Sequence, residues 1–410
     1  MPFLTPPAKD RPMSTVDVIS QLIIWTLATI TLTGCVNASG TLREASRLVE
    51  QVRPDVNLGE VKVDVWRSQS TVEKWHGEST EFLSFPYVHR ILEAQRPHFV
   101  RFGMEHALKI LVTQRLAADA PQLPAFVVPG SPSTIVARAQ AAGSLHTMTH
   151  ELGHIASWRK GYWKRPGPYL WLDEGKAGDP HWIDLDSFIA GWAIEEGTAE
   201  LTSIAAMQLT KPEVERTDII DFANLAAGNA LSTGMLAPLV IRTQQFAYGN
   251  GLRYVCARGG AEGLTLEERL EAAWAGFRGT SREILFPHET STPSRLAVAL
   301  RRDLETLEPR PMTATRWGAF LLFEVLSEHE GYEVAELLPV LKGYRDDILL
   351  SFEGDRHLWF TEWADVEVAE EFARRIWKCL PSAEVESAGI RVTVSWSGPE
   401  RAKSWWTSSP

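Results

Sequence analysis

Hydrophobic positions recur along this chain with two different periods, and the two patterns together predict a mixed α+β fold. Residues 60–69 alternate between apolar and polar positions, which is typical of a half-buried strand. Two more strands are expected at 122–130, where prolines bound an apolar run, and at 134–139. Helical spacing predicts helices at 42–52, 85–95, 102–118, 143–158 and 187–209.

The second half of the chain has mainly helical spacing. Expected helices lie at 217–230, 234–258, 264–277, 294–306, 314–328, 332–342 and 366–378. A short hairpin is expected at about 346–362 and a late strand at 389–397, and the last residues, 398–410, are expected to fray. Residues 159–186 are rich in proline, glycine and tryptophan, which predicts an irregular loop.

The amino terminus has the pattern of a secretory signal. Lys9 and Arg11 precede an apolar run from Val18 to Leu32. The run ends in Leu-Thr-Gly-Cys, which resembles a bacterial lipobox and implies lipidation of Cys35 and a membrane anchor facing outside the cytoplasm. The alternative is an uncleaved membrane anchor, because the run is near the shortest length that spans a bilayer. Translation that begins at Met13 is a further alternative.

These patterns divide the 410 residues into five parts. We expect a lipoprotein signal peptide at 1–34, a tether at 35–59, an N-terminal α+β part at 60–121, the main domain at 122–380, and a C-terminal strand and tail at 381–410. The net charge of −11 gives no indication of nucleic-acid binding. Beyond Cys35 the cysteines are Cys256 and Cys379, which either pair or stay buried as thiols.

The run HELGH at 150–154 carries the clearest chemical signal. On a helix, positions i and i+4 share a face, so His150 and His154 can bind one metal ion. Glu151 then lies at the rim of that face, where it can take a proton from a metal-activated water. His146 lies one turn earlier, and we expect a second-shell or solvent-facing role for it. A chance match on an ordinary amphipathic helix is the alternative.

A zinc site of this kind needs a third protein ligand and an open fourth position. Glu174 and Glu196 both stand in a Glu-Gly-x-Ala run. Glu174 leads into Gly-Asp-Pro, which breaks a helix, whereas Glu196 lies in the proline-free segment 187–209. A rigid helix positions a ligand better than a loop does, which favours Glu196 and leaves Glu174 as the alternative. Glu200, one turn further, can accept the second ring N–H of a ligand histidine.

Several of these motifs together resemble a group of bacterial HExxH proteins in the gluzincin clan, many of them lipoproteins or secreted proteins. The resemblance rests on HELGH, Asp184-x-Asp186, Ala190-x-x-Ala193 and Glu196-Gly197-Thr198-Ala199. In that group a helix with Glu-Gly-x-Ala supplies the glutamate ligand, which also points to Glu196. The resemblance implies a zincin fold: a thermolysin-like core with a small sheet over the HExxH helix, and a mainly helical C-terminal lobe.

The resemblance extends over roughly residues 126–380. Its downstream parts are 246–251, Gly259-Gly260, 280–287, 317–322 and, in degraded form, 343–347. Phe286 stands where the group usually has a histidine, so the role of that histidine is in doubt here. Tyr248 is similar in position to tyrosines that hydrogen-bond the oxyanion in several gluzincins. Its alternative role is packing beneath the cleft.

We therefore expect a zinc-dependent metallohydrolase of the cell envelope, a peptidase that acts on peptide or protein substrates. Trp158, Trp163 and Trp171 would form an aromatic subsite or, alternatively, pack in the core. The competing hypothesis is a non-catalytic envelope lipoprotein with a degenerate zincin fold that acts as a scaffold or binding module. Another amide, such as a peptidoglycan cross-link, is a third possibility for the substrate.

Overall fold

The computed structural model describes residues 37–66, 125–128, 132–162, 172–173, 181–210, 223, 239–260, 263–289, 294, 296, 309–330 and 334–397. The signal segment with Cys35, the expected helices at 85–95 and 102–118, and most of those at 217–230 and 294–306 lie outside the described residues. So do Glu174, Trp163 and Trp171.

Helices and strands alternate along the described parts of the chain. The first half contains α2 (Ala38–Val52), β1 (Val61–Trp66), β2 (Ala125–Val128), β3 (Ser133–Arg138), α7 (Ala139–Ala142), α8 (Leu145–Lys160), β4 (Leu172–Asp173), β5 (His181–Asp184) and α9 (Leu185–Gln208). The second half contains α11 (Leu239–Gln245), the π-helical turn η4 (Phe246–Asn250), α12 (Gly251–Arg258), α13 (Leu266–Ala275), α14 (Ser281–Leu285), β6 (Thr313–Arg316), α16 (Gly318–Glu330), α17 (Val334–Lys342), β7 (Tyr344–Phe352), β8 (Arg356–Trp363), α18 (Val366–Cys379), β9 (Glu384–Ala388) and β10 (Arg391–Ser397).

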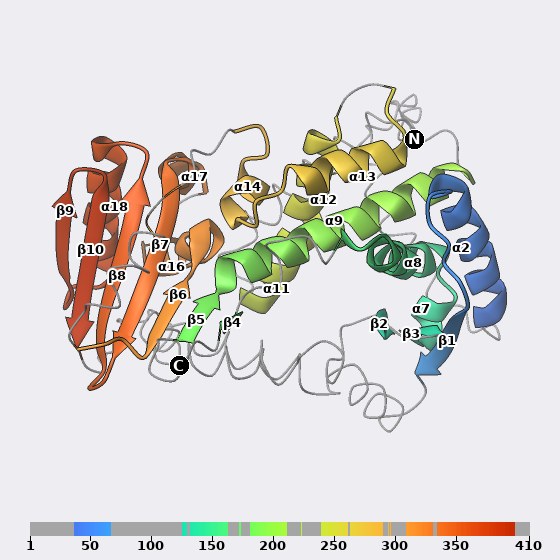
Figure 1. The fold of residues 1–410 in the computed structure, drawn as a ribbon, viewed down its shortest axis with the longest axis horizontal. Coiled ribbons are helices and arrows are strands. Elements are labelled where there is room, and N and C mark those ends of the chain that lie inside the picture. Colours follow the sequence, from blue (N-terminus) through green and yellow to red (C-terminus); the bar gives the residue numbers. More distant parts are fainter. Residues whose placement is uncertain are drawn as a thin grey trace, which may run out of the picture.

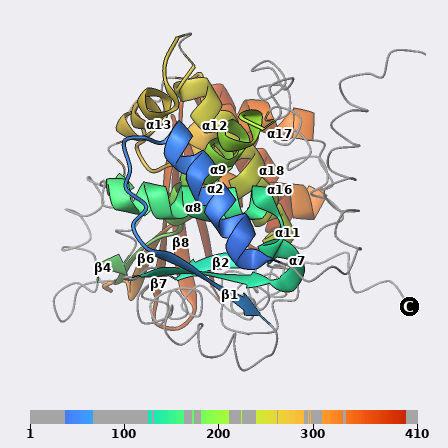
Figure 2. The same ribbon diagram turned by 90° about the vertical axis from the view of Figure 1, so that its right-hand side faces the viewer.

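The 24-residue helix α9 runs through the middle of the molecule and connects two regions (Figure 1). At one end lie a seven-stranded sheet and the helices that cover it. At the other end α8 and α2 pack over a three-stranded sheet, which Figure 2 shows beneath α8. The hydrophobic core is divided accordingly, with one large cluster around α9, α16 and the large sheet and a smaller one between α2, α8 and the small sheet.

The small sheet confirms the three strands expected at 60–69, 122–130 and 134–139. Its order is β1-β3-β2, with β1 parallel and β2 antiparallel to β3. Because β1 pairs with β3, residues 61–66 belong to the same structural unit as the HELGH helix and not to a separate N-terminal part.

Helix α2 is part of the fold, although it falls in the segment 35–59 that we expected to be a tether. Asn37 caps its first turn by accepting a hydrogen bond from the N–H of Gly40 at 2.9 Å. Its apolar face is buried in the smaller core cluster through Leu42, Ala45, Leu48 and Val49. The apolar stripe of an amphipathic helix must be covered, and here α8 and α9 cover it.

The large sheet contains more strands than the sequence analysis expected. Its order is β4-β5-β6-β7-β8-β10-β9. The expected hairpin at 346–362 is the pair β7–β8 at the middle of this sheet, and β6 occupies the start of the segment expected as one helix at 314–328. Residues expected to form an irregular loop supply β5, which pairs in parallel with β6. The C-terminal strand β10 is also integral, because Val392, Val394 and Trp396 are buried in the large cluster.

Among the described residues, no helix combines the length and the apolar composition needed to cross a bilayer. Cys256 and Cys379 are not joined by a disulfide, and Cys379 is buried.

Candidate metal centre

Helix α8 holds the two histidines of the HELGH run on one face. Ser144 caps the helix by accepting a hydrogen bond from the N–H of Thr147 at 3.2 Å. The helix ends at Gly161, whose φ of +78° is a left-handed conformation that suits glycine. His150 and His154 therefore project one turn apart from a well-capped helix, with the side chain of His150 almost fully buried.

Helix α9 presents Glu196 to that face, and small residues allow the close approach. Asp184 caps α9 by accepting from the N–H of Ser187 at 2.8 Å. A Cβ on Gly153 would lie 2.8 Å from the Cα of Ala199, so only glycine lets the two helices pack this closely. The glycine of HELGH and the alanine of Glu-Gly-x-Ala thus meet where α8 crosses α9.

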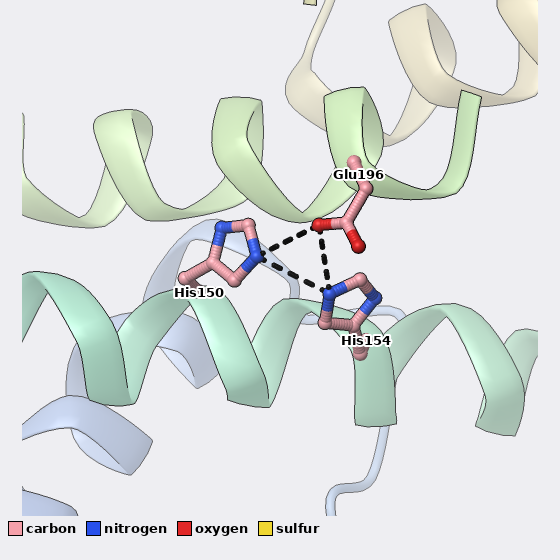
Figure 3. Close-up of side chains that lie close together, drawn as sticks. All are labelled: His150, His154 and Glu196. Carbon is pink, nitrogen blue, oxygen red and sulfur yellow. Dashed lines mark hydrogen bonds and ion pairs between the residues drawn. The ribbon is translucent and has the colours of Figure 1, made fainter. Parts of the chain in front are cut away.

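Three ligand-type atoms converge between the two helices (Figure 3). Nε2 of His150 lies 3.2 Å from Nε2 of His154 and 3.2 Å from Oε2 of Glu196. Nε2 of His154 lies 3.4 Å from the same Oε2. Tetrahedral zinc, with bonds of about 2.0–2.1 Å to these atoms, places its ligands about 3.4 Å apart. The spacing and the two-nitrogen, one-oxygen donor set therefore fit Zn²⁺.

A second layer of side chains contacts the far nitrogens of both imidazoles. Glu200, expected as a partner of one histidine, has Oε2 3.0 Å from Nδ1 of His150 and Oε1 3.1 Å from Nε2 of His146. The side chain of His146 is 41% exposed, so His146 contacts Glu200 and also faces solvent. Such contacts fix the tautomer and the ring orientation of a ligand histidine.

The sequence analysis missed two residues of this layer, Glu195 and Trp192. Glu195 has Oε1 3.8 Å from Nδ1 of His154 and accepts a hydrogen bond from the indole N–H of Trp158 at 2.6 Å. Trp192 donates its indole N–H to Oε1 of Glu196 at 2.7 Å. The i to i+4 spacing of Trp192 and Glu196 was the one available signal in the sequence. Trp158, considered for an aromatic subsite, also packs against the smaller core cluster.

Electrostatics in this cluster favour positive charge between the carboxylates. Burial by itself lowers the pKa of His150, but hydrogen bonds to Glu196 and Glu200 outweigh it and raise the pKa to about 9. Burial also opposes protonation of His154, yet Glu196 and Glu195 raise its pKa well above the usual value. In turn the histidines hold the pKa of Glu196 far below its usual value despite burial. A divalent cation would satisfy the same electrostatic preference.

Glu151 and Tyr248 flank the three ligand-type residues. The side chain of Glu151 is buried, and burial raises its pKa although the two histidines oppose the shift. Tyr248 comes from the π-helical turn η4, and its ring stacks on His150 with a centroid separation of 5.5 Å. Desolvation on the side of the site, together with the carboxylates of Glu196 and Glu151, raises the pKa of Tyr248 well above its usual value. Tyr248 remains 39% exposed, so its hydroxyl is a neutral group at the edge of the cluster.

Glycines also explain how Tyr248 approaches the site. A Cβ on Gly197 would lie 2.3 Å from the carbonyl carbon of Gly251, and a Cβ on Gly251 would lie 1.9 Å from the carbonyl oxygen of Ala193. The backbones of α9 and α12 are therefore in direct contact. This contact fixes η4, and with it Tyr248, against the helix that carries Glu196.

Three of the downstream motifs, those at 280–287, 317–322 and 343–347, converge on a different place, the amino end of α9. There Arg316 contacts three carboxylates, with Nε 2.8 Å from Asp346, Nη2 3.3 Å from Asp186 and Nη1 3.6 Å from Asp184. Together with Asp347 we call these residues the aspartate cluster. Ser281 donates both its N–H and its hydroxyl to Asp186.

Asp347 and Gly318 complete this arrangement. Asp347 accepts from the N–H groups of Trp317 and Gly318, and from the side chains of Trp359 and Tyr344. Gly318 has a φ of +84° and touches Asp186. Phe286, the departure from the motif, packs against the large core cluster beneath Arg282. These motif residues hold the large sheet onto α9.

Comparison of the chain with protein-family models, with curated proteins and with solved structures found no match.

Proposed function

We propose that this protein is a zinc-dependent metallohydrolase that cleaves peptide bonds, with His150, His154 and Glu196 as the zinc ligands. The observation that carries the proposal is the convergence of two imidazole nitrogens and one carboxylate oxygen at 3.2–3.4 Å from one another. Two further carboxylates, Glu195 and Glu200, contact the outer nitrogens of the imidazoles, which is the usual arrangement around histidine ligands of zinc.

The neighbouring side chains have the properties that amide hydrolysis requires. When bound, the metal supplies Lewis acidity, which polarises the substrate carbonyl and makes water a better nucleophile. Glu151 accepts the proton of the attacking water and passes it to the leaving amine, and its raised pKa suits both steps. Tyr248, neutral and partly exposed, donates its hydroxyl to the oxygen that becomes negative in the tetrahedral transition state.

The proposal includes a zincin-like placement of the substrate. The three-stranded sheet lies next to α8, and β2 is at the edge of that sheet as far as the described residues go. An extended peptide that pairs with β2 would run alongside the HELGH helix. We further propose that lipidation of Cys35 anchors the protein at the bacterial cell envelope, in keeping with the signal-like sequence at 1–34.

Metal content of the purified protein tests the ligand assignment. We expect about one zinc per wild-type chain and loss of that zinc in Glu196→Ala, because a carboxylate oxygen completes the site. Glu174→Ala is the matched control, since Glu174 is the competing ligand from the sequence. Loss of zinc only in Glu174→Ala would move the third ligand to that residue, and absence of zinc from the wild type would favour a non-catalytic scaffold.

Catalysis is tested separately with Glu151→Gln. This variant should keep its zinc and lose about 10²–10⁴-fold in the rate of cleavage of labelled casein or of a mixed peptide library. Glu267→Gln, which alters a carboxylate that pairs with Lys160 away from the site, should cleave at the wild-type rate. Normal activity in Glu151→Gln would rule out the proposed proton transfer. A zinc-loaded wild type that cleaves neither substrate would argue for a binding module.

A further inference from the structure

The two carboxylate oxygens of Glu196 have different neighbours. Oε2 faces both imidazole nitrogens, at 3.2 Å from His150 and 3.4 Å from His154 (Figure 3). Oε1 accepts the indole N–H of Trp192 at 2.7 Å. One oxygen is therefore directed at the metal position while the other is engaged by a neutral donor on the same helix.

Trp192 is well placed to hold this orientation. It lies four residues before Glu196 on α9, so the backbone geometry of the helix brings the two side chains together. Its ring is partly buried and packs against the large hydrophobic cluster. An indole N–H is only a donor, so it cannot exchange roles with the carboxylate or bind the metal itself. The hydrogen bond of 2.7 Å to the buried carboxylate of Glu196 is short and holds Oε1 toward the indole.

We propose that Trp192 is a positioning residue that keeps Glu196 a one-oxygen ligand. The inference rests on the proposed zinc site. If both oxygens of Glu196 reached the metal, the carboxylate would occupy a position that water and substrate need. Trp192 prevents this by holding Oε1 away, and so it preserves the open coordination position on which hydrolysis depends.

Glu195 provides an internal contrast. Its Oε1 also accepts an indole N–H, that of Trp158 at 2.6 Å, but it contacts the outer nitrogen of His154 and not the metal position. Trp274 provides a second contrast, because it donates its indole N–H to Thr198 on the same helix at 3.0 Å. A substitution of Trp274 therefore removes an indole donor to α9 but keeps the indole donor to Glu196.

The test compares the full chain, wild type, with Trp192→Phe and with Trp274→Phe as matched control. Each protein is stripped, loaded with Co²⁺ and examined by visible absorption, and its Zn²⁺ affinity is measured by competition with a chelator. In Trp192→Phe we expect weaker d–d bands, because the coordination number rises, and about 10-fold or more loss of zinc affinity. Trp274→Phe should match the wild type in both measurements.

A second pair separates the hydrogen bond from the packing of the ring. Trp192→Gln and Trp192→Met both lose the indole, but only glutamine offers an N–H at the same spacing. The glutamine variant should have the stronger Co²⁺ bands and the higher zinc affinity of the two. Wild-type spectrum and affinity in Trp192→Phe, or identical behaviour of the glutamine and methionine variants, would overturn the inference while leaving the zinc site intact. A wild type that binds neither metal would overturn the proposed function and the inference together.

Discussion

His150, His154 and Glu196 form a His–Glu cluster between α8 and α9. This cluster and the aspartate cluster at the amino end of α9 are both buried and polar, but they balance charge differently. In the aspartate cluster the carboxylates face Arg316, Ser281 and backbone N–H groups, so the chain itself supplies the counter-charge and the donors. In the His–Glu cluster, lone-pair atoms of three side chains point at one another. Burial of converging acceptors is unfavourable unless a proton or a cation lies between them.

The two clusters are about 15 Å apart along one rigid helix, as the 1.5 Å rise per residue between Asp186 and Glu196 implies. A buried polar group therefore indicates structure or chemistry according to what satisfies it. Disturbing the aspartate cluster should cost stability, and disturbing the His–Glu cluster should cost metal binding and catalysis.

The largest effect on stability is expected from Asp347→Ala. The substitution leaves four buried donors, those of Trp317, Gly318, Trp359 and Tyr344, without their acceptor. We expect the free energy of unfolding to fall by at least about 3 kcal/mol in urea titrations. Asp365→Ala, which removes an exposed helix cap from α18, is the control and should cost about 1 kcal/mol. A fall in the free energy of unfolding no greater than that of the control would contradict the structural role of Asp347. Loss of zinc from the folded variant would contradict the distinction between the two clusters.

Removal of the metal from the His–Glu cluster should lower the stability of the protein, by an amount that depends on pH. Chelation should lower the free energy of unfolding by about 4 kcal/mol where free zinc had exceeded its dissociation constant a thousandfold. In the metal-free protein the pKa of His150 is raised to about 9 from 6.5. Its stabilising contribution is therefore complete below pH 6.5 and is lost as the pH rises through 9.

Zinc must displace the protons of these histidines. Its affinity should therefore rise as the pH rises from 6.5 to 9, because fewer protons then have to be displaced. The difference in Tm between loaded and stripped protein should widen from pH 6.5 to pH 9. A difference that narrows, or stripped protein with the Tm of loaded protein, would contradict the assignment of His150 to the metal.

Tyr248→Phe should separate chemistry from binding within the His–Glu cluster. Phenylalanine removes the hydroxyl of the partly exposed Tyr248 and keeps the ring that stacks on His150. We expect kcat/KM to fall about 100-fold, with zinc content and Tm unchanged. Tyr254→Phe removes a buried hydroxyl that contacts Ala273 and serves as the control for activity. Equal rates for Tyr248→Phe and wild type would leave Tyr248 with a packing role only.

The smallest effect is expected from Gly197→Ala, one residue after Glu196 on α9. Its new methyl group would overlap the backbone of Gly251, and overpacking of this kind costs about 1–3 kcal/mol. Gly276→Ala is the control, because its Cβ would lie at an ordinary 3.5 Å from the nearest atom. Urea unfolding measures the cost, and zinc affinity shows whether α9 has shifted. A variant as stable as the control would mean that the contact with α12 adapts easily.

Much of the candidate site followed from local pattern. Ser144 and Asp184 cap α8 and α9 near the expected boundaries, and the i to i+4 spacing placed His150 and His154 on one face. The absence of proline from 187–209 correctly predicted the long helix that carries Glu196. Caps, breakers and periodicity act within a few residues, so the sequence shows them directly.

The partners in the outer layer could not be predicted in the same way. Whether Glu195 or Glu200 contacts a given imidazole depends on the rotation of α9 against α8, which Gly153 and Ala199 decide in three dimensions. The large sheet was predicted only in part: the hairpin β7–β8 was expected, but β5 and β6 were not. Both are strands of four residues, and their pairing joins segments far apart in the chain, so local pattern gives little sign of them.

The sequence was enough to predict the helices of the site, the shared face of the two histidines and the long helix that carries Glu196, because those features depend on local spacing and on helix-breaking residues. Only the tertiary structure decided that the three ligand atoms lie 3.2–3.4 Å apart, that two indoles hold adjacent glutamates, and that α2 and the large sheet belong to one fold with the site. Most of these contacts join residues far apart in the chain, and their geometry is set by which small side chains allow two backbones to touch.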